Sequence, residues 1–260
     1  MKKNLKVLYF SPTDNTAKIV RAIAKGFDAN EIYEALPIRF PEAMDLKPVY
    51  TSDDILIVGV PVYAGRVPSI LLPFFDHLKG NNALVVLVAV YGNRDYEDAL
   101  LELTNIFENN GFIAVGAGAF VGEHSYTDKV GTGRPDLSDL AIAHKFGSDI
   151  AKKISKLALG KLTVGGNYPY KERRIIPPMG PETSDACNHC GLCAKLCPVH
   201  AISQVDYKTI EKSLCVRCHS CVRCCPVHAK SFNSEAIVQI TQSLIDHCSM
   251  VRHEPKLFIE

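Results

Sequence analysis

The first 186 residues of this chain contain no cysteine, although its 260 residues include ten. Nine of the ten lie between Cys187 and Cys225. Cysteines spread over a small secreted domain would indicate a disulfide framework, whereas thiols confined to one stretch suit a reducing compartment and a local site. We therefore expect a cytoplasmic protein whose cysteine chemistry is confined to the C-terminal third.

Long apolar runs and strong charge are also missing. The longest apolar stretches, residues 55–62 and 83–91, are much shorter than the roughly 20 residues of a membrane-spanning helix. Residues 1–3 resemble the start of a secretory signal, but the apolar stretch at 7–10 is too short to complete one. The formal net charge is +1, without a basic tract. These absences exclude a membrane and a nucleic acid as expected partners.

A doubled cysteine motif is the strongest signal that is present. Residues 187–198 read C-N-H-C-G-L-C-A-K-L-C-P, and residues 215–226 read C-V-R-C-H-S-C-V-R-C-C-P. Both fit C-x-x-C-x-x-C-x-x-x-C-P, and both continue as V-H-A. Three thiolates two residues apart can wrap around one face of a cubane, while the fourth lies at a helix start, which the proline suits. The repeat predicts two pseudo-symmetric halves.

This motif resembles that of bacterial two-cluster [4Fe–4S] ferredoxins, in which each fourth cysteine binds the cluster of the other run. The resemblance implies that one cluster is held by Cys187, Cys190, Cys193 and Cys225. It implies that the second is held by Cys215, Cys218, Cys221 and Cys197. Two structural zinc sites are the alternative, because C-x-x-C pairs also bind zinc, but zinc would not require the third and fourth cysteines with proline in both runs. Cys224 and Cys248 receive no cluster role.

The first 160 residues alternate apolar runs with helical patterns. We expect strands at residues 6–10, 32–38, 54–60, 83–90 and 112–120. Helices are expected after the first, fourth and fifth of these strands, the last of them over about 136–159. Continuous apolar strands separated by helices are typical of a parallel sheet covered on both faces. The pattern predicts an α/β, doubly wound, five-stranded parallel sheet.

Loops at the carboxyl ends of these strands are where such sheets bind ligands. The loop S-P-T-D-N-T at residues 11–16 resembles the phosphate loop of flavodoxins, and P-V-Y-A-G-R and Y-G-N-R-D-Y resemble their flavin-ring loops. The resemblance implies an FMN phosphate site formed by Ser11, Thr13, Asp14, Asn15 and Thr16. It implies a ring site formed by Pro61, Val62, Tyr63, Ala64, Gly65, Tyr91, Gly92, Asn93, Arg94 and Tyr96.

Two details of these loops carry further expectations. Asp14 stands where glycine is usual, so its carboxylate must point away from a phosphate or cap a backbone donor, and Asp tolerates positive φ. Arg66 and Arg94 would bring positive charge towards the ring, which predicts an FMN that is easy to reduce fully. The alternative is that both arginines point to solvent or pair with Asp95 and the FMN phosphate.

Other nucleotide and catalytic motifs fit poorly. Gly116-Ala117-Gly118 lies inside an expected strand and lacks the third glycine of a dinucleotide motif. His124 and Ser125 occur without the glycine pattern of a nucleophile elbow. Neither a nicotinamide site nor a hydrolase is predicted.

The remaining sequence divides into a linker, a cysteine domain and a tail. Residues 161–181 are rich in proline and predict a tethered, semi-extended linker. Its cluster Lys171-Glu172-Arg173-Arg174 is interpreted as a solvated face, with a docking patch for an acidic partner as the alternative. Residues 182–232 form the ferredoxin-like α+β domain, with short strands at 201–205 and 209–211. Residues 233–260 hold a helix over 234–250. His189 and His219 are expected to be exposed in the cluster loops.

Together, residues 1–160 and 182–232 resemble the flavodoxin–ferredoxin fusion proteins found mostly in anaerobic bacteria and archaea. The resemblance implies electron transfer between two [4Fe–4S] clusters and FMN within one chain, serving a redox protein partner. The alternative is an FMN-dependent reductase of a small organic substrate, supplied with electrons by its own ferredoxin domain.

Overall fold

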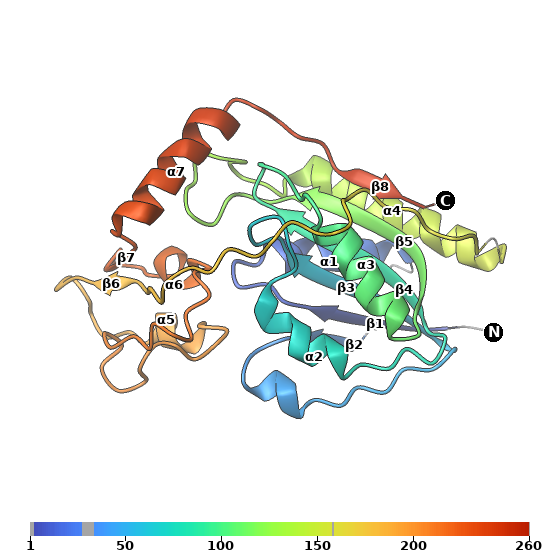
Figure 1. The fold of residues 1–260 in the computed structure, drawn as a ribbon, viewed down its shortest axis with the longest axis horizontal. Helices are drawn as coiled ribbons and strands as arrows, with labels where there is room; N and C mark the ends of the chain where they lie inside the picture. The colour runs from blue at the N-terminus through green and yellow to red at the C-terminus, as the bar shows by residue number, and fades with distance from the viewer. Residues whose placement is uncertain (1–2, 28–33, 158, 260) are drawn as a thin grey trace.

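The computed structural model describes residues 3–27, 34–157 and 159–259, which form an α/β domain and a smaller cysteine-bearing domain (Figure 1). The strands of the α/β domain are β1 (Asn4–Tyr9), β2 (Glu34–Pro37), β3 (Asp54–Pro61), β4 (Leu84–Tyr91), β5 (Ile113–Val121) and β8 (Lys256–Phe258). Its helices are α1 (Asn15–Phe27), α2 (Leu72–Asp76), α3 (Ala99–Asn109) and α4 (Leu137–Ser155), with 3₁₀ turns η1 (Glu42–Asp45) and η2 (Ser69–Leu71). None of the described helices combines the length and apolar character needed to cross a bilayer.

The sheet has the order β2-β1-β3-β4-β5-β8. Strands β1 to β5 are parallel, and β8 is antiparallel to β5. The order 2-1-3-4-5 is that of flavodoxin-like folds, with its switch point between β1 and β3. The expected five-stranded sheet is therefore corrected to six strands, because the tail adds an edge strand of three residues. Residues 32–33 of the expected second strand lie outside the described part of the chain.

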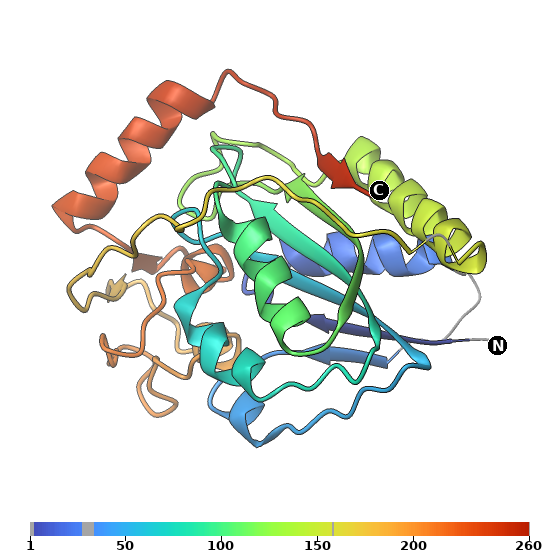
Figure 2. The ribbon, with the colours of Figure 1, turned by 45° about the vertical axis from the view of Figure 1, so that its right-hand side comes forward.

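Helices cover both faces of this sheet (Figure 2). Helices α1 and α4 pack together over one face, and α2 and α3 lie over the other. Every residue of β4 is buried, which explains its unbroken apolar sequence. The backbones of α1 and α4 come into contact at Gly147, where an added Cβ would lie 2.1 Å from the carbonyl oxygen of Ile23. Glycine therefore permits this close helix crossing.

The smaller domain lies beyond the carboxyl ends of the parallel strands (Figure 1). Its elements are short: β6 (Glu182–Thr183), α5 (Leu192–Lys195), α6 (Ser220–Arg223) and β7 (Lys230–Ser231). Strands β6 and β7 pair with each other. The expected strands at 201–205 and 209–211 reduce to one bridge between Ile202 and Ile210. The chain already turns at Asp206, whose carboxylate accepts from the N–H groups of Lys208 and Thr209.

Two segments connect the domains. Residues 159–181 contain no helix or strand and run back along the α/β domain towards the smaller one (Figure 1). After the smaller domain, α7 (Glu235–Cys248) leads into the tail that ends in β8. The helix expected over 234–250 is thus present with nearly the same bounds. The smaller domain is held to the α/β domain at both of its ends.

Candidate functional site

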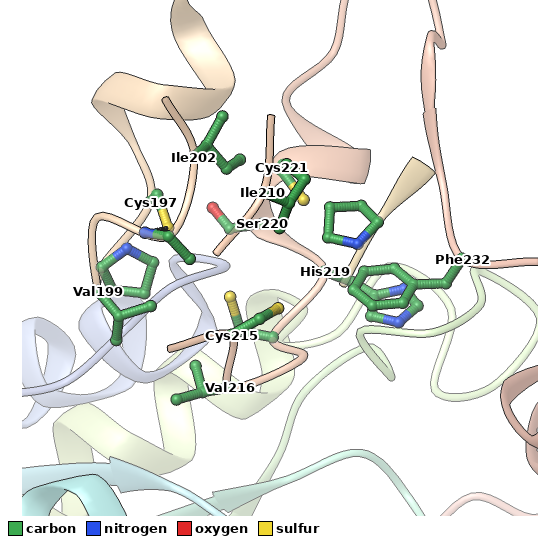
Figure 3. A pocket seen from close by; sticks show the side chains of 14 residues that line it. Cys197, Val199, Ile202, Ile210, Cys215, Val216, His219, Ser220, Cys221 and Phe232 are labelled. Carbon is green, nitrogen blue, oxygen red and sulfur yellow. Dashed lines mark hydrogen bonds between the residues drawn. The ribbon is translucent and has the colours of Figure 1, made fainter. Parts of the chain in front are cut away.

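Eight cysteines of the smaller domain line two separate cavities. The inner cavity, which faces the α/β domain, is lined by Cys197, Cys215, Cys218 and Cys221, among others (Figure 3). The outer cavity is lined by Cys187, Cys190, Cys193 and Cys225, among others. Each set combines three cysteines of one run with the fourth of the other, as the ferredoxin resemblance implies. In the described ranges, no three His, Cys, Asp or Glu side chains gather closely enough to hold a single metal ion.

The backbone repeats itself in the two cysteine runs. Left-handed residues recur at equivalent positions 28 residues apart: His189 (φ 57°) and Arg217 (φ 54°), Gly191 (φ 75°) and His219 (φ 59°), and His200 and His228 (both φ 50°). The first two pairs turn the chain between the cysteines of a run, and the third pair turns it just after the last cysteine. Only one of the six is glycine, and the others carry the cost of a conformation that side chains disfavour. The predicted pseudo-symmetry of the two halves is present in the backbone.

The sulfur atoms sit in surroundings that suit metal-bound thiolates. The N–H of Ala201 donates to Cys197 Sγ over 3.3 Å, and the N–H of Ala229 donates to Cys225 Sγ over 3.1 Å. Burial raises the pKa of the Cys218 thiol to about 12. A metal must therefore displace a proton there, and the binding energy is coupled to folding. Four thiols around each enclosed space, with N–H groups directed at sulfur, fit a [4Fe–4S] cluster.

The two remaining cysteines lie outside both cavities. Cys224 is half-buried and its Sγ lies 3.7 Å from the carbonyl oxygen of Cys221. Burial raises the pKa of Cys224 to about 11. Cys248, at the end of α7, is buried and packs with Val130 and Leu244. Cys248 thus fills a core position, the usual role of a free cysteine, while Cys224 is only partly covered.

The loop after β1 forms a turn into α1. Ser11 Oγ accepts from the N–H of Ala17 over 3.0 Å, and Asp14 has φ 66°. The side chain of Asp14 is 58% exposed and lies 3.8 Å from Arg21, so its carboxylate points outward. Thr16 is buried, with its methyl group 2.8 Å from where a Cβ on Gly59 would lie. The first turn of α1, whose N–H groups lack helical acceptors, thus starts at the carboxyl end of β1.

The loop after β3 is a tight turn. Tyr63 and Arg66 exchange two backbone hydrogen bonds, of 3.0 and 3.1 Å, around Ala64 (φ 51°) and Gly65 (φ 82°). Positive φ at both central residues is the geometry of a type I′ turn. An alanine held in this conformation is strained, and such strain occurs at functional sites. Glycine is favoured at position 65 by its φ of 82°, and an added Cβ would also lie 2.9 Å from Glu97 Cβ.

The loop after β4 is more buried than the sequence suggested. Tyr91 and Tyr96 are 4% and 7% exposed, and their rings pack in the core with centroids 5.8 Å apart. Asn93 has φ 56° and its side chain donates to the carbonyl oxygens of Cys248 and Val251, over 3.0 and 2.6 Å. Tyr91 and Tyr96 are therefore occupied by core packing, and Asn93 binds the tail. Tyr63 is the half-buried tyrosine of this group.

The two arginines of these loops are each paired with a carboxylate. Arg66 forms hydrogen bonds of 2.8 and 2.7 Å to the buried Glu102, which also pairs with Arg173 of the linker. Arg94 pairs with Glu97. Both arginines are paired, as in the alternative, but with Glu102 and Glu97 in place of Asp95 or the FMN phosphate. Each of these two acids also pairs with a second cation, from the linker. All four residues of the basic cluster 171–174 are exposed, as expected of a solvated face, although Lys171 pairs with Glu97 and Arg173 with Glu102.

Residues 122–127, after β5, connect the turn after β1 with the smaller domain. Asn15 Nδ2 donates to the carbonyl oxygen of Glu123 over 3.0 Å. From the other side, Arg223 of α6 pairs with the Glu123 carboxylate and donates to the carbonyl oxygens of His124, Ser125 and Thr127. One arginine beside a cysteine run thus holds the loop that also contacts Asn15 in the turn after β1.

A stack of three rings crosses the same interface. His219, between two cysteines of the inner cavity, is 4% exposed and lies between Tyr126 and Phe232, with ring centroids 4.2 and 4.3 Å away. Burial lowers the pKa of His219 to about 3, and its Nε2 has no hydrogen-bond partner among the described residues. The expectation of an exposed His219 is wrong, because its neighbours come from other parts of the chain. His189 is exposed, as expected.

Two family models match parts of this chain. Residues 15–127 match the model of NADPH-dependent FMN reductases, and residues 183–203 match that of 4Fe-4S binding domains. The chain therefore combines a flavodoxin-like FMN domain with a 4Fe–4S motif, and these are the features of an iron–sulfur flavoprotein that takes part in electron transport. No curated protein matches the sequence.

Solved structures resemble the α/β domain. A flavodoxin from the domain Archaea is 15% identical, with a TM-score of 0.38, over 58% of this chain and 99% of that one. The two-electron reduced flavodoxin of Megasphaera elsdenii is 19% identical, with a TM-score of 0.40, over 57% and 98%. An apo NADH:FMN oxidoreductase is 18% identical, with a TM-score of 0.42, over 61% and 90%. Because these TM-scores are low, the fold is assigned from the strand order.

Proposed function

We propose that this protein transfers electrons between two [4Fe–4S] clusters and one FMN within a single chain, as a redox adaptor for a protein partner. The inner cluster would be held by the four cysteines of the inner cavity and the outer cluster by those of the outer cavity. The FMN phosphate would bind at residues 11–16, and its ring would lie between residues 61–65 and 91–93. A cluster exchanges one electron at a time, whereas a flavin exchanges one or two.

The observation that carries this proposal is the ring stack between the inner cavity and the flavin loops. Tyr126 follows the strand next to β4, and it stacks on His219, which lies directly after Cys218. Tyr63, in the loop after β3, is also close enough to Cys215 and Cys218 to interact with them electrostatically. This proximity supports a short path from the inner cluster to the flavin. In the outer cavity, Cys190 is exposed, which suits exchange with a partner.

The chain's own residues bind and orient the cofactors in this scheme. Hydroxyl groups and the first N–H groups of α1 would receive the phosphate, since a helix N-terminus favours an anion. The strained turn at Ala64 would present backbone to the ring edge. Arg223 and the two connecting segments keep the domains together, which replaces a diffusional encounter by a high effective concentration.

Cofactor analysis and single-turnover kinetics test the proposal. Anaerobically isolated protein should contain about eight irons, about eight sulfides and about one FMN per chain. When a one-electron donor is mixed with the oxidised protein, Tyr126→Leu should slow reduction of the FMN relative to that of the clusters. Tyr168→Leu is the matched control, because Tyr168 is 79% exposed. Zinc in place of iron, or equal kinetics in both variants, would contradict the proposal.

A reductase acting on a small substrate is the second candidate. The match of residues 15–127 to the model of NADPH-dependent FMN reductases favours it. Steady-state oxidation of NADPH with free FMN, a quinone or a nitroaromatic compound as acceptor would support this function. If NADPH is not oxidised with any of these acceptors, and a low-potential iron–sulfur protein reduces this protein rapidly, the adaptor function is supported instead.

A further inference from the structure

The two cavities differ at one equivalent position. Lys230 follows Cys225 by five residues and lines the outer cavity, and Ile202 follows Cys197 by five residues and lines the inner cavity. The positions are 28 residues apart, like the other equivalent pairs, and both side chains are 3% exposed. The repeated motif therefore places a buried amine in the wall of one cavity and an alkyl group in the wall of the other.

The amine of Lys230 is bound by neutral groups. Its Nζ donates to Thr183 Oγ1 and to the carbonyl oxygen of Tyr207, each over 2.6 Å. Across the described ranges it forms no ion pair with a carboxylate. A buried charge without a counter-charge is costly, so such a site favours an anion nearby. The two acceptors fix Nζ and leave its third hydrogen free.

The anion that fits is a cluster with its thiolates in the outer cavity. Lys230 interacts electrostatically with Cys193 and Cys225, and its backbone N–H contributes to the hydrogen bonding of the Cys225 sulfur. It also acts on Cys221 of the inner cavity, where the neighbouring thiols Cys218 and Cys215 have larger effects. Lys230 lines the outer cavity, whereas the lining of the inner cavity does not include it.

We propose that Lys230 makes the outer cluster easier to reduce than the inner cluster. Reduction adds one electron and one negative charge to a cluster, and a nearby ammonium stabilises the reduced form more than the oxidised form. Ile202 gives the inner cluster no such stabilisation. The inference rests on the proposed function, and it predicts that an electron shared by the two clusters resides on the outer one, at the exposed end of the path.

EPR-monitored redox titration of the anaerobic holoprotein tests this assignment. Lys230→Met should lower the ratio of reduced to oxidised outer cluster at least tenfold at a fixed ambient potential, which corresponds to about 59 mV for a one-electron couple. The inner cluster should shift less. Lys230→Arg, which keeps the charge, should stay near the wild type. Ile202→Met is the matched control and should leave the outer cluster unchanged. Cys187→Ala, expected to lose the outer cluster, identifies the two signals.

The outcomes separate this inference from the proposed function. A wild type with both clusters, in which Lys230→Met leaves both potentials unchanged, would overturn the role of Lys230 while the proposed function stands. A wild type that holds one cluster or zinc would overturn the proposed function itself. If Lys230→Met fails to hold iron, Lys230→Gln takes its place, because glutamine is uncharged but still polar. The same tenfold fall in the ratio of reduced to oxidised outer cluster is then expected, and an unchanged ratio would overturn the role of Lys230.

Discussion

The two domains differ in what determines their conformation. In the α/β domain, strands such as β4 are buried at every residue and helices lie over both faces, so apolar burial determines the fold. In the smaller domain the helices have four residues and the strands have two, and left-handed residues bend the chain between thiols. A domain of this size buries little apolar surface and needs metal or disulfides for stability. One domain is stabilised by its core, and the other by what its cysteines bind.

Removal of iron is the strongest way to break this comparison. Chelation under oxidising conditions should unfold residues 182–232 and leave strands β1–β5 of the α/β sheet intact, because only the smaller domain couples folding to metal. Hydrogen exchange followed by mass spectrometry should show protection of residues 182–232 falling to the level of an unfolded chain, while β3 and β4 remain protected. If both cysteine runs stay protected after complete loss of iron, the small apolar core is enough to keep the smaller domain folded, and the comparison fails.

Loss of the Glu102 carboxylate should weaken the α/β domain and the linker together. Glu102 is 3% exposed and accepts from Arg66, Arg173 and the N–H of Val67. Glu102→Gln leaves buried guanidinium charge uncompensated and should cost about 3 kcal/mol of unfolding free energy, measured in urea. Glu108→Gln in the same helix is the control, since Glu108 is exposed, and should change stability by less than about 0.5 kcal/mol.

Loss of Arg223 should separate the domains without unfolding either. Arg223→Gln removes the ion pair with Glu123 and the bonds to three carbonyl oxygens, a loss of about 1–2 kcal/mol at the interface. Faster hydrogen exchange at residues 123–127 and slower electron transfer to the FMN are the expected results. The exposed Arg174, changed to Gln, provides the control. If hydrogen exchange at residues 123–127 is unchanged in the Arg223 variant, the two connecting segments alone hold the domains together.

The smallest expected effect is a pH dependence at His124. Burial, with Arg223 and Arg94 nearby, lowers its pKa to about 4. In the unfolded chain the ring titrates near 6.5, so between about pH 6.5 and 4 the unfolded state binds the extra proton and stability falls as the pH falls. His124→Gln should reduce this loss by about 1 kcal/mol at pH 5.8 and change it little at pH 7.5. Parallel urea titrations at both pH values measure the difference.

Features with a local sequence signal were predicted well. The continuous apolar runs located β3, β4 and β5, and the ferredoxin resemblance grouped the thiols that line each cavity. The unusual Asp14 was expected to tolerate positive φ and to point away, and it does both.

Features that depend on distant partners were not predicted. Strand β8 has three residues and exists only because β5 has a free edge. His219 is buried by Tyr126 and Phe232, which come from two other parts of the chain. Asn93 looked like a flavin-loop residue, but the tail segment after α7 occupies its side chain. Tyr126 could have indicated the interface between the domains, since it is an aromatic residue in a loop at the carboxyl edge of the sheet.

The pairing of β8 with β5 also sets an order of events during synthesis. Residues 256–258 leave the ribosome after both cysteine runs, so the β5 edge stays unpaired while the smaller domain is made and supplied with iron. An open edge is a template for strands of other chains. Under iron starvation, nascent and newly released molecules whose smaller domain has not folded would expose this edge for longer. Aggregation during expression, and not loss of colour alone, is then the expected consequence of a failure in cluster assembly.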